Sequence, residues 1–290
     1  MKIVGFEVDG SARLGVVEGD RVIDLQAADA KAPADLAEWL RRGDLSTIAD
    51  LAKRAPANAR RPLAGLKFTL PVTNPGKIVC LGLNYLDHVK EGPQKDNIPK
   101  FQSIFFRMRS SLVPHMHPLM RPQKSIQFDY EGELVVIIGK RAKHLTLANA
   151  TDCVAGYACG MEGSIREYQR HTTQWGMGKN FDETGSVGPW MVTADELPKG
   201  GKGLKIETRL NGKTMQSSNT DLFMFPVAES LVYLTEGITL EPGDILFTGT
   251  PSGVGHARKP EPVWMKAGDT AEVDIQGIGT LRNTIEDEKL

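Results

Sequence analysis

Two acidic residues, Glu131 and Glu133, stand two positions apart, next to the apolar run at residues 134–138. The run is short and rich in β-branched residues, which predicts a buried strand. Because side chains at i and i+2 of a strand point to the same face, both carboxylates project to one side. A hard divalent cation such as Mg²⁺, Mn²⁺ or Ca²⁺ would relieve their repulsion and their lost solvation. The alternative is a solvated strand end that carries three acids, Asp129 included.

A third carboxylate and a histidine pair extend this chemistry. Glu162 follows a second predicted buried strand at residues 154–160, where it could complete a metal site. His88 and Glu91 are three residues apart at the end of a predicted short helix, 85–90, so their side chains can meet as a general-base pair. The alternative is an incidental ion pair on a surface helix. We expect Asn84 to cap this helix and residues 92–93, Gly-Pro, to end it.

Other candidates carry less weight. The HxH at residues 115 and 117 could bind metal, but flanking prolines and the lack of a third histidine favour a loop. Arg107 and Arg109 could select an acidic substrate tail or lie on a solvated loop. The sequence contains no GxGxxG after a strand, no GxxxxGK[ST] and no GxSxG, so it offers no dinucleotide, phosphate-loop or serine-hydrolase signature.

Composition narrows the class of protein. The 290 residues are 40% hydrophobic and 24% charged, which is typical of a soluble globular protein. A net charge of −1 without a basic run argues against a nucleic-acid partner, and no apolar stretch reaches 18 residues, which argues against a membrane span. Three cysteines without a CxxC argue against zinc and fit a reducing compartment. With no apolar leader at residues 1–10, we expect a cytoplasmic protein.

The elements that must position these residues are mostly short strands. Residues 1–25 predict an antiparallel meander with DG and GD turns, and residues 34–54 predict a helix. Prolines and glycine near residue 70 predict a small N-terminal α+β lobe over 1–70 and a main domain over 71–290. Within the main domain we expect a hairpin at 204–217, a helix at 226–237 and strands at 77–82, 245–248, 271–275 and 280–283. The interval 95–125 is expected to be irregular.

The chain resembles the fumarylacetoacetate hydrolase superfamily over residues 75–285. The resemblance rests on segments in family order: KIVCLGLNYLDHVKE (77–91), DYEGELVVIIGK (129–140), GYACGMEGSIREYQ (156–169), GKNFD (178–182), GPWMVT (188–193), RLNGKTMQ (209–216), LEPGDILFTGTPSGVG (240–255) and GIGTLRN (277–283). It implies a mixed, β-rich fold, with a β-sandwich or β-roll main domain, a small N-terminal lobe and a homodimer.

The resemblance also implies a metal site. In the family the two glutamates of ExE bind Mg²⁺ or Mn²⁺, and here these are Glu131 and Glu133. The third ligand is usually the Asp of an NDVS-like segment. Here Glu162 takes that position and Met161 replaces the usual Asn, so this chain departs from the pattern at the edge of the substrate pocket.

Substrates of the family are 2-oxo acids with a second carbonyl or carboxylate. Lys179, in the family's GK[SN]F segment, would share the charge of a pyruvate-type enolate with the metal. His88 with Glu91 would activate water for carbon–carbon hydrolysis of an acylpyruvate in aromatic catabolism. Gln169 and Thr250 match substrate-binding positions.

Arg166 matches an arginine that touches substrate or braces its loop. Two further functions remain open. One is a decarboxylase, isomerase or hydratase acting on a related 2-oxo acid. The other is a non-catalytic metal-containing binding protein, suggested by the altered third ligand.

Overall fold

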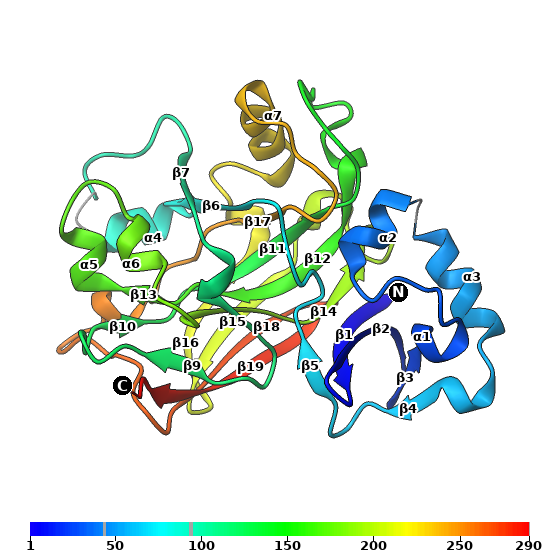
Figure 1. Cartoon of the computed structure of the whole chain (residues 1–290). Coiled ribbons are helices and arrows are strands. Elements are labelled where there is room, and N and C mark those ends of the chain that lie inside the picture. The colour runs from blue at the N-terminus through cyan, green and yellow to red at the C-terminus, as the bar shows by residue number, and fades with distance from the viewer. Residues whose placement is uncertain (43–44, 93–94, 290) are drawn as a thin grey trace.

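The computed structural model of the chain describes residues 1–42, 45–92 and 95–289. Figure 1 shows the N-terminal segment, coloured blue, beside a larger β-rich body that holds the rest of the chain. Within the described ranges the largest sheet has twelve strands in the order β4-β3-β2-β1-β14-β12-β11-β17-β6-β7, with β5 beside β1 and β8 beside β14. A second sheet has five strands in the order β16-β15-β18-β19-β9, and β10 pairs with β13.

The N-terminal meander is confirmed. Its strands are β1 (Lys2–Val8), β2 (Ser11–Glu18) and β3 (Arg21–Asp24), followed by β4 (Arg60–Pro62) and β5 (Lys67–Thr69). The structure has two helices where one was predicted over 34–54: α2 (Leu36–Arg42) and α3 (Ser46–Arg54). Residues 43 and 44 of that prediction lie outside the described residues, and a short α1 (Leu25–Ala28) precedes both helices.

The first strand joins the N-terminal segment to the large sheet. β1 pairs antiparallel with β14 (Gly185–Thr193), with Ile3 opposite Met191. The Met1 ammonium donates to Thr193 Oγ1 at 2.6 Å and pairs with Glu196 at 2.7 Å. The sheet therefore runs without a break from residues 1–70 into the rest of the chain, and the division at residue 70 stays a prediction.

Two facing sheets make the main body. The remaining strands of the large sheet are β6 (Ile78–Gly82), β7 (Ser103–Phe106), β8 (Leu112–Pro114), β11 (Gly132–Ile138), β12 (Val154–Met161) and β17 (Ile245–Phe247). The second sheet contains β9 (Leu119–Arg121), β15 (Lys205–Leu210), β16 (Lys213–Asn219), β18 (Thr270–Ile275) and β19 (Gly279–Asp287).

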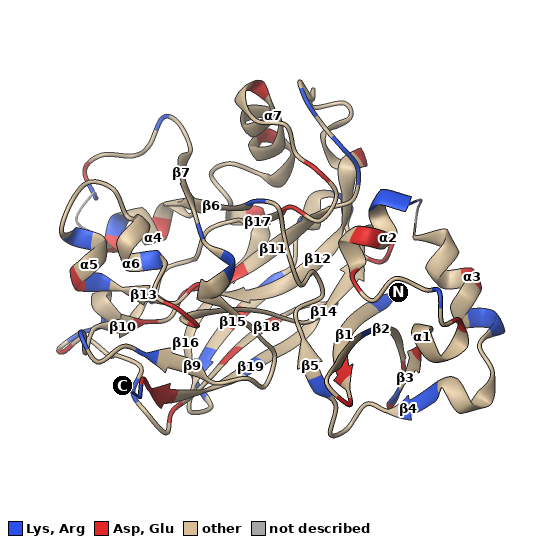
Figure 2. Ribbon diagram, viewed as in Figure 1, with Lys and Arg blue, Asp and Glu red and all other residues tan. Residues whose placement is uncertain are grey.

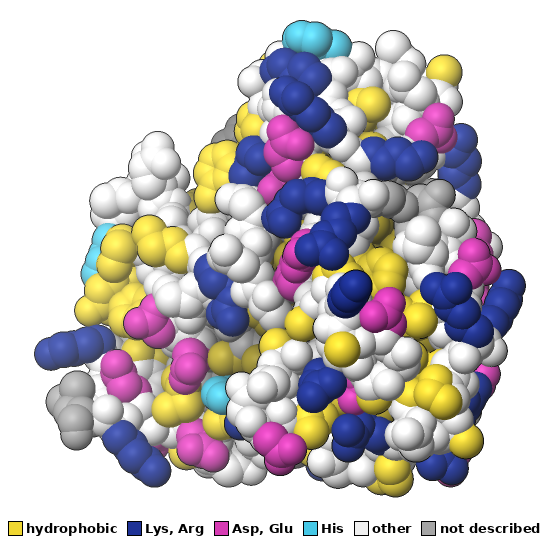
Figure 3. Space-filling model, turned by 45° about the vertical axis from the view of Figure 1, so that its right-hand side comes forward, with side chains coloured by type: hydrophobic (Ala, Val, Ile, Leu, Met, Phe, Trp, Pro, Cys, Tyr) yellow, Lys and Arg dark blue, Asp and Glu magenta, His cyan; other side chains and the backbone are white. Residues whose placement is uncertain are grey.

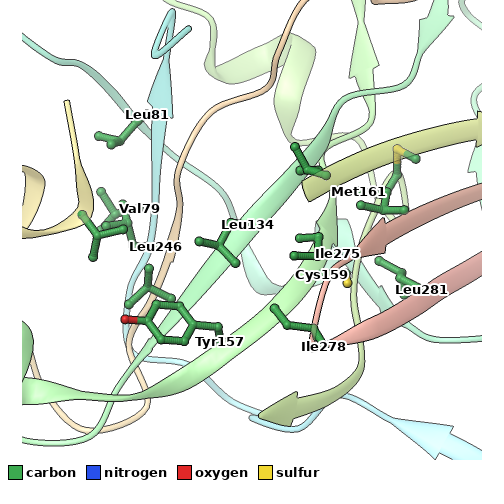
Figure 4. Close-up of a cluster of buried hydrophobic side chains, with 14 of the residues drawn as sticks. Val79, Leu81, Leu134, Tyr157, Cys159, Met161, Leu246, Ile275, Ile278 and Leu281 are labelled. Atoms are coloured by element: carbon green, nitrogen blue, oxygen red, sulfur yellow. The ribbon is translucent and has the colours of Figure 1, made fainter. Parts of the chain in front are cut away.

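The core lies between these sheets. Figure 4 shows Leu134 and Cys159 of the large sheet beside Ile275 and Leu281 of the second sheet, and all four are at most 1% exposed. Packing of two apolar sheet faces against each other defines a sandwich. The predicted mixed, β-rich class is thus confirmed.

Several local predictions can be compared with these elements. The hairpin β15–β16 turns at Asn211 and Gly212, both with positive φ, as predicted, and α7 (Val227–Gly237) lies where a helix was expected. The prediction that residues 95–125 are irregular is wrong, because β7, β8 and β9 lie in this interval. These strands are three or four residues long, and β8 and β9 pair with strands distant in sequence, so no local periodicity marks them.

Three short helices gather beside the ends of β11 and β12. They are α4 (Leu86–Glu91), α5 (Arg166–Arg170) and α6 (Gly176–Lys179), with the two-residue strands β10 (Phe128–Asp129) and β13 (Ser164–Ile165) beneath them. Basic and acidic residues lie together on α4 and α5 (Figure 2). On the face in Figure 3, both basic and acidic side chains occur, in keeping with the small net charge. Among the described helices, none is both long and apolar enough to cross a bilayer.

Candidate metal and acid–base site

Three buried glutamates meet where β11 and β12 lie side by side. Glu133 is in β11, opposite Gly160, and the Glu131 carbonyl accepts a hydrogen bond from the Glu162 amide at 2.8 Å. One carboxylate oxygen from each glutamate lies within 4.8 Å of the others. The three side chains are only 1–3% exposed. The solvated strand end considered from the sequence is therefore excluded.

Gly132 holds the first two glutamates in register. A Cβ at this position would lie 2.0 Å from the Thr208 hydroxyl on β15, so a larger residue would push the two sheets apart. The Gly132 amide donates to Gln216 Oε1 at 2.9 Å. The close approach of the second sheet thus fixes the backbone between Glu131 and Glu133.

Glu131 is the most heavily paired of the three. Its oxygens accept hydrogen bonds from Arg166 Nη2 at 2.6 Å, from Ser164 Oγ at 3.0 Å and from the Lys179 ammonium. Burial alone would raise the pKa of Glu131, but the charges of Arg166 and Lys179 outweigh burial and hold it below its usual range. Glu131 is therefore ionised at neutral pH.

Glu133 and Glu162 have fewer hydrogen-bond donors and positive charges around them than Glu131 has. Glu133 accepts a hydrogen bond from the Gly249 amide at 2.7 Å, and burial, with the negative charges of Glu162 and Glu131, raises its pKa well above the ordinary value. Glu162 Oε2 accepts from Lys179 Nζ at 2.8 Å, while its Oε1 has no hydrogen-bond partner among the described residues and lies 3.9 Å from Arg107 Nη1.

An oxygen-seeking divalent cation fits this donor set. Three hard carboxylate ligands converge, one carboxylate oxygen has no hydrogen-bond donor among the described residues, and burial with the neighbouring negative charges raises the pKa of the Glu133 carboxyl. Glu131, Glu133 and Glu162 could hold such an ion. The extra methylene of Glu162, compared with the expected aspartate, does not prevent its carboxylate from reaching the other two.

Arg166 braces this wall of the site. Its guanidinium donates to Asp129 Oδ2 at 2.7 Å and to Gln169 Oε1 at 2.7 Å, in addition to Glu131. Asp129 also accepts from the amides of Gly255 and His256 at 2.6 and 3.0 Å. Because each of its three guanidinium nitrogens donates to protein, the structure favours the bracing role for Arg166 over substrate contact.

His88 lies on α4 with its ring oriented by Glu91. Nδ1 donates to Glu91 Oε1 at 2.8 Å, and Glu91 Oε2 accepts from the Gly253 amide at 2.8 Å. This arrangement leaves His88 Nε2 as the ring nitrogen that can exchange a proton with a ligand.

The expected N-cap role of Asn84 is wrong, because Tyr85 is the N-cap residue of α4 and makes no side-chain capping bond. The Asn84 amide instead donates to the Thr248 carbonyl at 2.7 Å and accepts from the Phe225 amide at 2.7 Å. It thereby ties the start of α4 to the loops after β17 and before α7. Gly92 follows the helix as predicted, and residue 93 lies outside the described residues.

The predicted residues share one cavity of about 360 Å³. Its wall includes His88, Glu131, Glu133, Glu162, Arg166, Gln169, Lys179 and Thr250, and Glu91 stands behind His88. Thr250 Oγ1 donates to the Gly132 carbonyl at 3.0 Å and accepts from Gln216 at 2.8 Å.

Neither arginine of the FFRMRSS segment lines this cavity. Arg107 is 4% exposed and donates to Ser111, Gly163 and Thr184. Arg109 donates to the Thr73 and Leu112 carbonyls. Both side chains bond to protein groups, and burial rules out the solvated loop for Arg107, while a role in substrate selection stays a prediction.

The two histidines of the HxH segment are not in the cavity wall either. His115 Nδ1 accepts from the Arg282 amide at 3.0 Å, and its ring packs edge-on against Phe68 at 4.6 Å. Burial, followed by the Arg282 charge, lowers its pKa to about 4. His115 is therefore a neutral packing residue in the described structure.

Sequence reasoning missed several residues of the cavity and its support, among them Phe105, Trp175, Asp129 and His256. Phe105 and Trp175 form apolar wall, with their rings 5.7 Å apart, and the Lys179 ammonium lies 5.0 Å from the Phe105 ring. Asp129 and His256 form the pair behind Arg166. Asp129 lies beside ExE, but its partners come from residues 166 and 255–256, and no spacing in the sequence joins these segments.

The comparisons with known proteins bear on this site. The family described as Fumarylacetoacetate (FAA) hydrolase C-terminal matches residues 77–286. The chain belongs to the fumarylacetoacetate hydrolase family. The mitochondrial oxaloacetate tautomerase Fahd2a of Rattus norvegicus is 39% identical over 271 residues, which cover 92% of this chain and 84% of the relative.

Solved structures of the family share the fold. The fumarylacetoacetate hydrolase from Exiguobacterium antarcticum has a TM-score of 0.85 and 35% identity, with 99% of this chain and 100% of that chain covered. The maleylpyruvate hydrolase from Sphingobium sp. SYK-6, solved with manganese(II) and pyruvate, has a TM-score of 0.82 and 28% identity, with both chains fully covered. Relatives in this family are enzymes, both hydrolases and tautomerases.

The expectation of a cytoplasmic protein is wrong as stated. The similar oxaloacetate tautomerases of rat, cattle and humans are named as mitochondrial, which conflicts with a purely cytoplasmic assignment. The expectation rested on the lack of an apolar leader. Mitochondrial transit segments are amphipathic rather than apolar, so that test could not distinguish the two locations.

Proposed function

We propose that the protein is a divalent-metal-dependent enzyme that interconverts the keto and enol forms of a 2-oxo acid of the oxaloacetate type. The observation that carries the proposal is the placement of two kinds of group on one cavity. One is the cluster of three glutamates with an unsatisfied oxygen, and the other is a histidine oriented by Glu91. Similarity to oxaloacetate tautomerases over most of their length supports the substrate type.

Enolisation needs a base and a stabilised negative charge. Glu131, Glu133 and Glu162 would hold Mg²⁺ or Mn²⁺, and the bound ion would supply a Lewis acid for the oxygens of the 2-oxo acid. His88 Nε2 takes a proton from the carbon next to the 2-oxo group, and delivery of a proton to the 2-oxo oxygen completes the enol; the reverse direction runs through the same two proton transfers. The Lys179 ammonium lines the same cavity and supplies positive charge near the ionised Glu131.

Hydrolysis of an acylpyruvate is the second candidate. The fixed His88–Glu91 pair favours it, because Glu91 is itself held by the Gly253 amide and the pair could activate water. The fold shared with maleylpyruvate hydrolase is further support. In this case the substrate would lose an acyl group as a carboxylic acid, with pyruvate as the other product.

A direct assay separates these functions. Purified protein with Mg²⁺ or Mn²⁺ is given enol-oxaloacetate, and loss of the enol absorbance is followed against protein-free buffer containing the same ion. A second assay measures pyruvate released from acetylpyruvate, and a third measures CO₂ from oxaloacetate. We expect accelerated loss of enol that stops when EDTA removes the ion. Pyruvate release without tautomerisation would favour the hydrolase, CO₂ release would favour the decarboxylase, and no turnover of any substrate would favour the binding protein.

The homodimer implied by the family resemblance stays a proposal. Light scattering at micromolar concentration should give twice the 31.7 kDa chain mass. A monomeric mass would refute the dimer and leave the proposed chemistry untouched.

A further inference from the structure

Two arginines on α5 line the cavity, and they are paired very differently. Arg166 and Arg170 are four residues apart, so their side chains leave the same face of the helix. Arg166 is buried and donates to two carboxylates and an amide oxygen. Within the described chain, the side chain of Arg170 makes no hydrogen bond or ion pair, although it lines the same cavity.

Arg170 is an exposed residue that is only partly buried against its neighbours, so water solvates much of its guanidinium. Burial, followed by repulsion from Arg166, lowers the pKa of its guanidinium, and the attraction of Asp129 and Glu167 offsets only part of this effect. Asp129 is already in direct contact with Arg166. Arg170 therefore presents free N–H donors and positive charge to whatever enters the cavity.

A second group on this wall also lacks a partner. His256, at the short 3-10 helix of residues 255–257, lines the cavity and is held through Nδ1 by Asp129 Oδ2 at 3.2 Å. Its Nε2 is buried and has no hydrogen-bond partner in the described structure. A buried nitrogen without a partner is costly, and a bound polar ligand would remove that cost.

We propose that Arg170 and His256 form a second subsite that binds the distal carboxylate of the substrate. The proposal rests on the proposed function, in which the glutamate end of the cavity takes the 2-oxo acid group. A guanidinium presents a fork of N–H donors that matches a carboxylate, whereas an uncharged substrate tail would leave both groups unpaired. Arg170 is then a specificity-determining residue that favours 2-oxo dicarboxylates over 2-oxo monocarboxylates of equal length.

The test compares two ligands that differ only in this carboxylate. Oxaloacetate and 2-oxobutanoate have the same four-carbon chain, and only oxaloacetate carries a carboxylate at the far end. Their affinities are measured by calorimetry on the Mn²⁺-loaded protein, for the wild type, Arg170→Met, His256→Phe and the control Arg141→Met. Arg141 is an exposed arginine paired with Glu241 and is not part of the cavity wall.

We expect the wild type to prefer oxaloacetate by about 10-fold or more, the effect of a charge-assisted hydrogen bond. Arg170→Met should remove most of this preference, His256→Phe should reduce it several-fold, and Arg141→Met should keep it. Binding of 2-oxobutanoate should change less than about twofold in Arg170→Met.

Three results would overturn the subsite. In the first, Arg170→Met keeps the wild-type preference for oxaloacetate. In the second, Arg170→Met loses affinity for both acids by the same factor. In the third, the wild type binds the two acids with equal affinity or binds neither. Because the readout is binding, absence of turnover would refute the proposed function without refuting the subsite.

Discussion

Two buried carboxylate regions lie on the same large sheet and are satisfied in opposite ways. At the start of β17, Asp244 is 1% exposed, and its oxygens accept from the Lys77 amide at 2.8 Å, from Lys77 Nζ at 2.7 Å and from the Glu241 amide at 2.8 Å. At the ends of β11 and β12, Lys179 pairs with Glu131 and Glu162, and Arg166 pairs with Glu131 and Asp129, while Glu133 makes no ion pair among the described residues.

The difference separates an acid that is fully paired within the chain from a cluster that we propose to bind a metal ion. Asp244 is one negative charge with one cation and two amides, so its pairing is complete within the chain. The glutamate cluster keeps an oxygen without a donor and a carboxyl whose pKa is raised by burial and by its acidic neighbours. A folded chain tolerates such a deficit where a ligand later supplies the missing charge. The four predictions below test this contrast.

The largest effect is expected at Glu133. Glu133→Gln removes one anionic ligand but keeps the shape of the side chain, so metal affinity should fall and metal-dependent turnover should drop by about 10³-fold or more. Calorimetry with Mn²⁺ and kcat under saturating metal measure the two quantities. Asp244→Asn serves as the control and should bind Mn²⁺ as the wild type does. Wild-type turnover in Glu133→Gln would show that the cluster is not the metal site.

His88 tests whether the base is separate from the charged cluster. His88→Ala should lower kcat by about 10²–10⁴-fold if the ring is the general base. Mn²⁺ affinity should stay unchanged, because no glutamate of the cluster depends on His88 for a hydrogen bond. For the decarboxylation of oxaloacetate, which needs no base, we expect a much smaller loss. A variant with the wild-type rate of tautomerisation and acetylpyruvate cleavage would remove His88 from the mechanism.

Asp244 should behave in the opposite way to Glu133. Asp244→Ala leaves two amides and the Lys77 ammonium without their acceptor, and we expect a loss of about 2–4 kcal/mol of unfolding free energy. The Lys77 side chain is 30% exposed, so water replaces part of that pairing. Urea unfolding measures the change. An unchanged midpoint would mean that the completed pairing contributes nothing net to stability.

The smallest effect is a pH dependence of the metal-free protein. The folded-state pKa of Glu133 lies above its ordinary value of 4.5, so the folded chain keeps a proton that the unfolded chain releases. The stabilising contribution of that proton is complete below pH 4.5 and falls as pH rises towards the folded-state pKa.

Glu133→Gln replaces the titrating carboxyl with an amide, so the variant has no such pH-dependent contribution. We therefore expect the variant, relative to the wild type, to gain a few degrees of Tm as pH rises from about 5 to 8 in the presence of EDTA. Scanning calorimetry at both pH values measures this. Parallel Tm curves for the two proteins would show that Glu133 carries no raised pKa.

Much of the fold and of the candidate site followed from local patterns. The alternation in residues 1–25, the Asn211–Gly212 turn and the apolar run after ExE each depend on neighbours within a few positions, and each corresponds to an element of the structure. His88 and Glu91 meet because a helix brings i and i+3 together. The short strands β8 and β9 escaped prediction, since their partners lie far along the chain.

The sequence by itself determined which side chains are available and which of them share a face: Glu131 with Glu133 on a strand, and His88 with Glu91 on a helix. Only the tertiary structure decided how charge is distributed among them. Arg166 is occupied by Asp129 and Glu131, while the Arg170 side chain, one helical turn away at the cavity wall, has no partner among the described residues. The physical reason is that pairing and burial depend on contacts between segments remote in sequence, such as residue 129 with residues 166 and 256, and local spacing carries no information about such contacts.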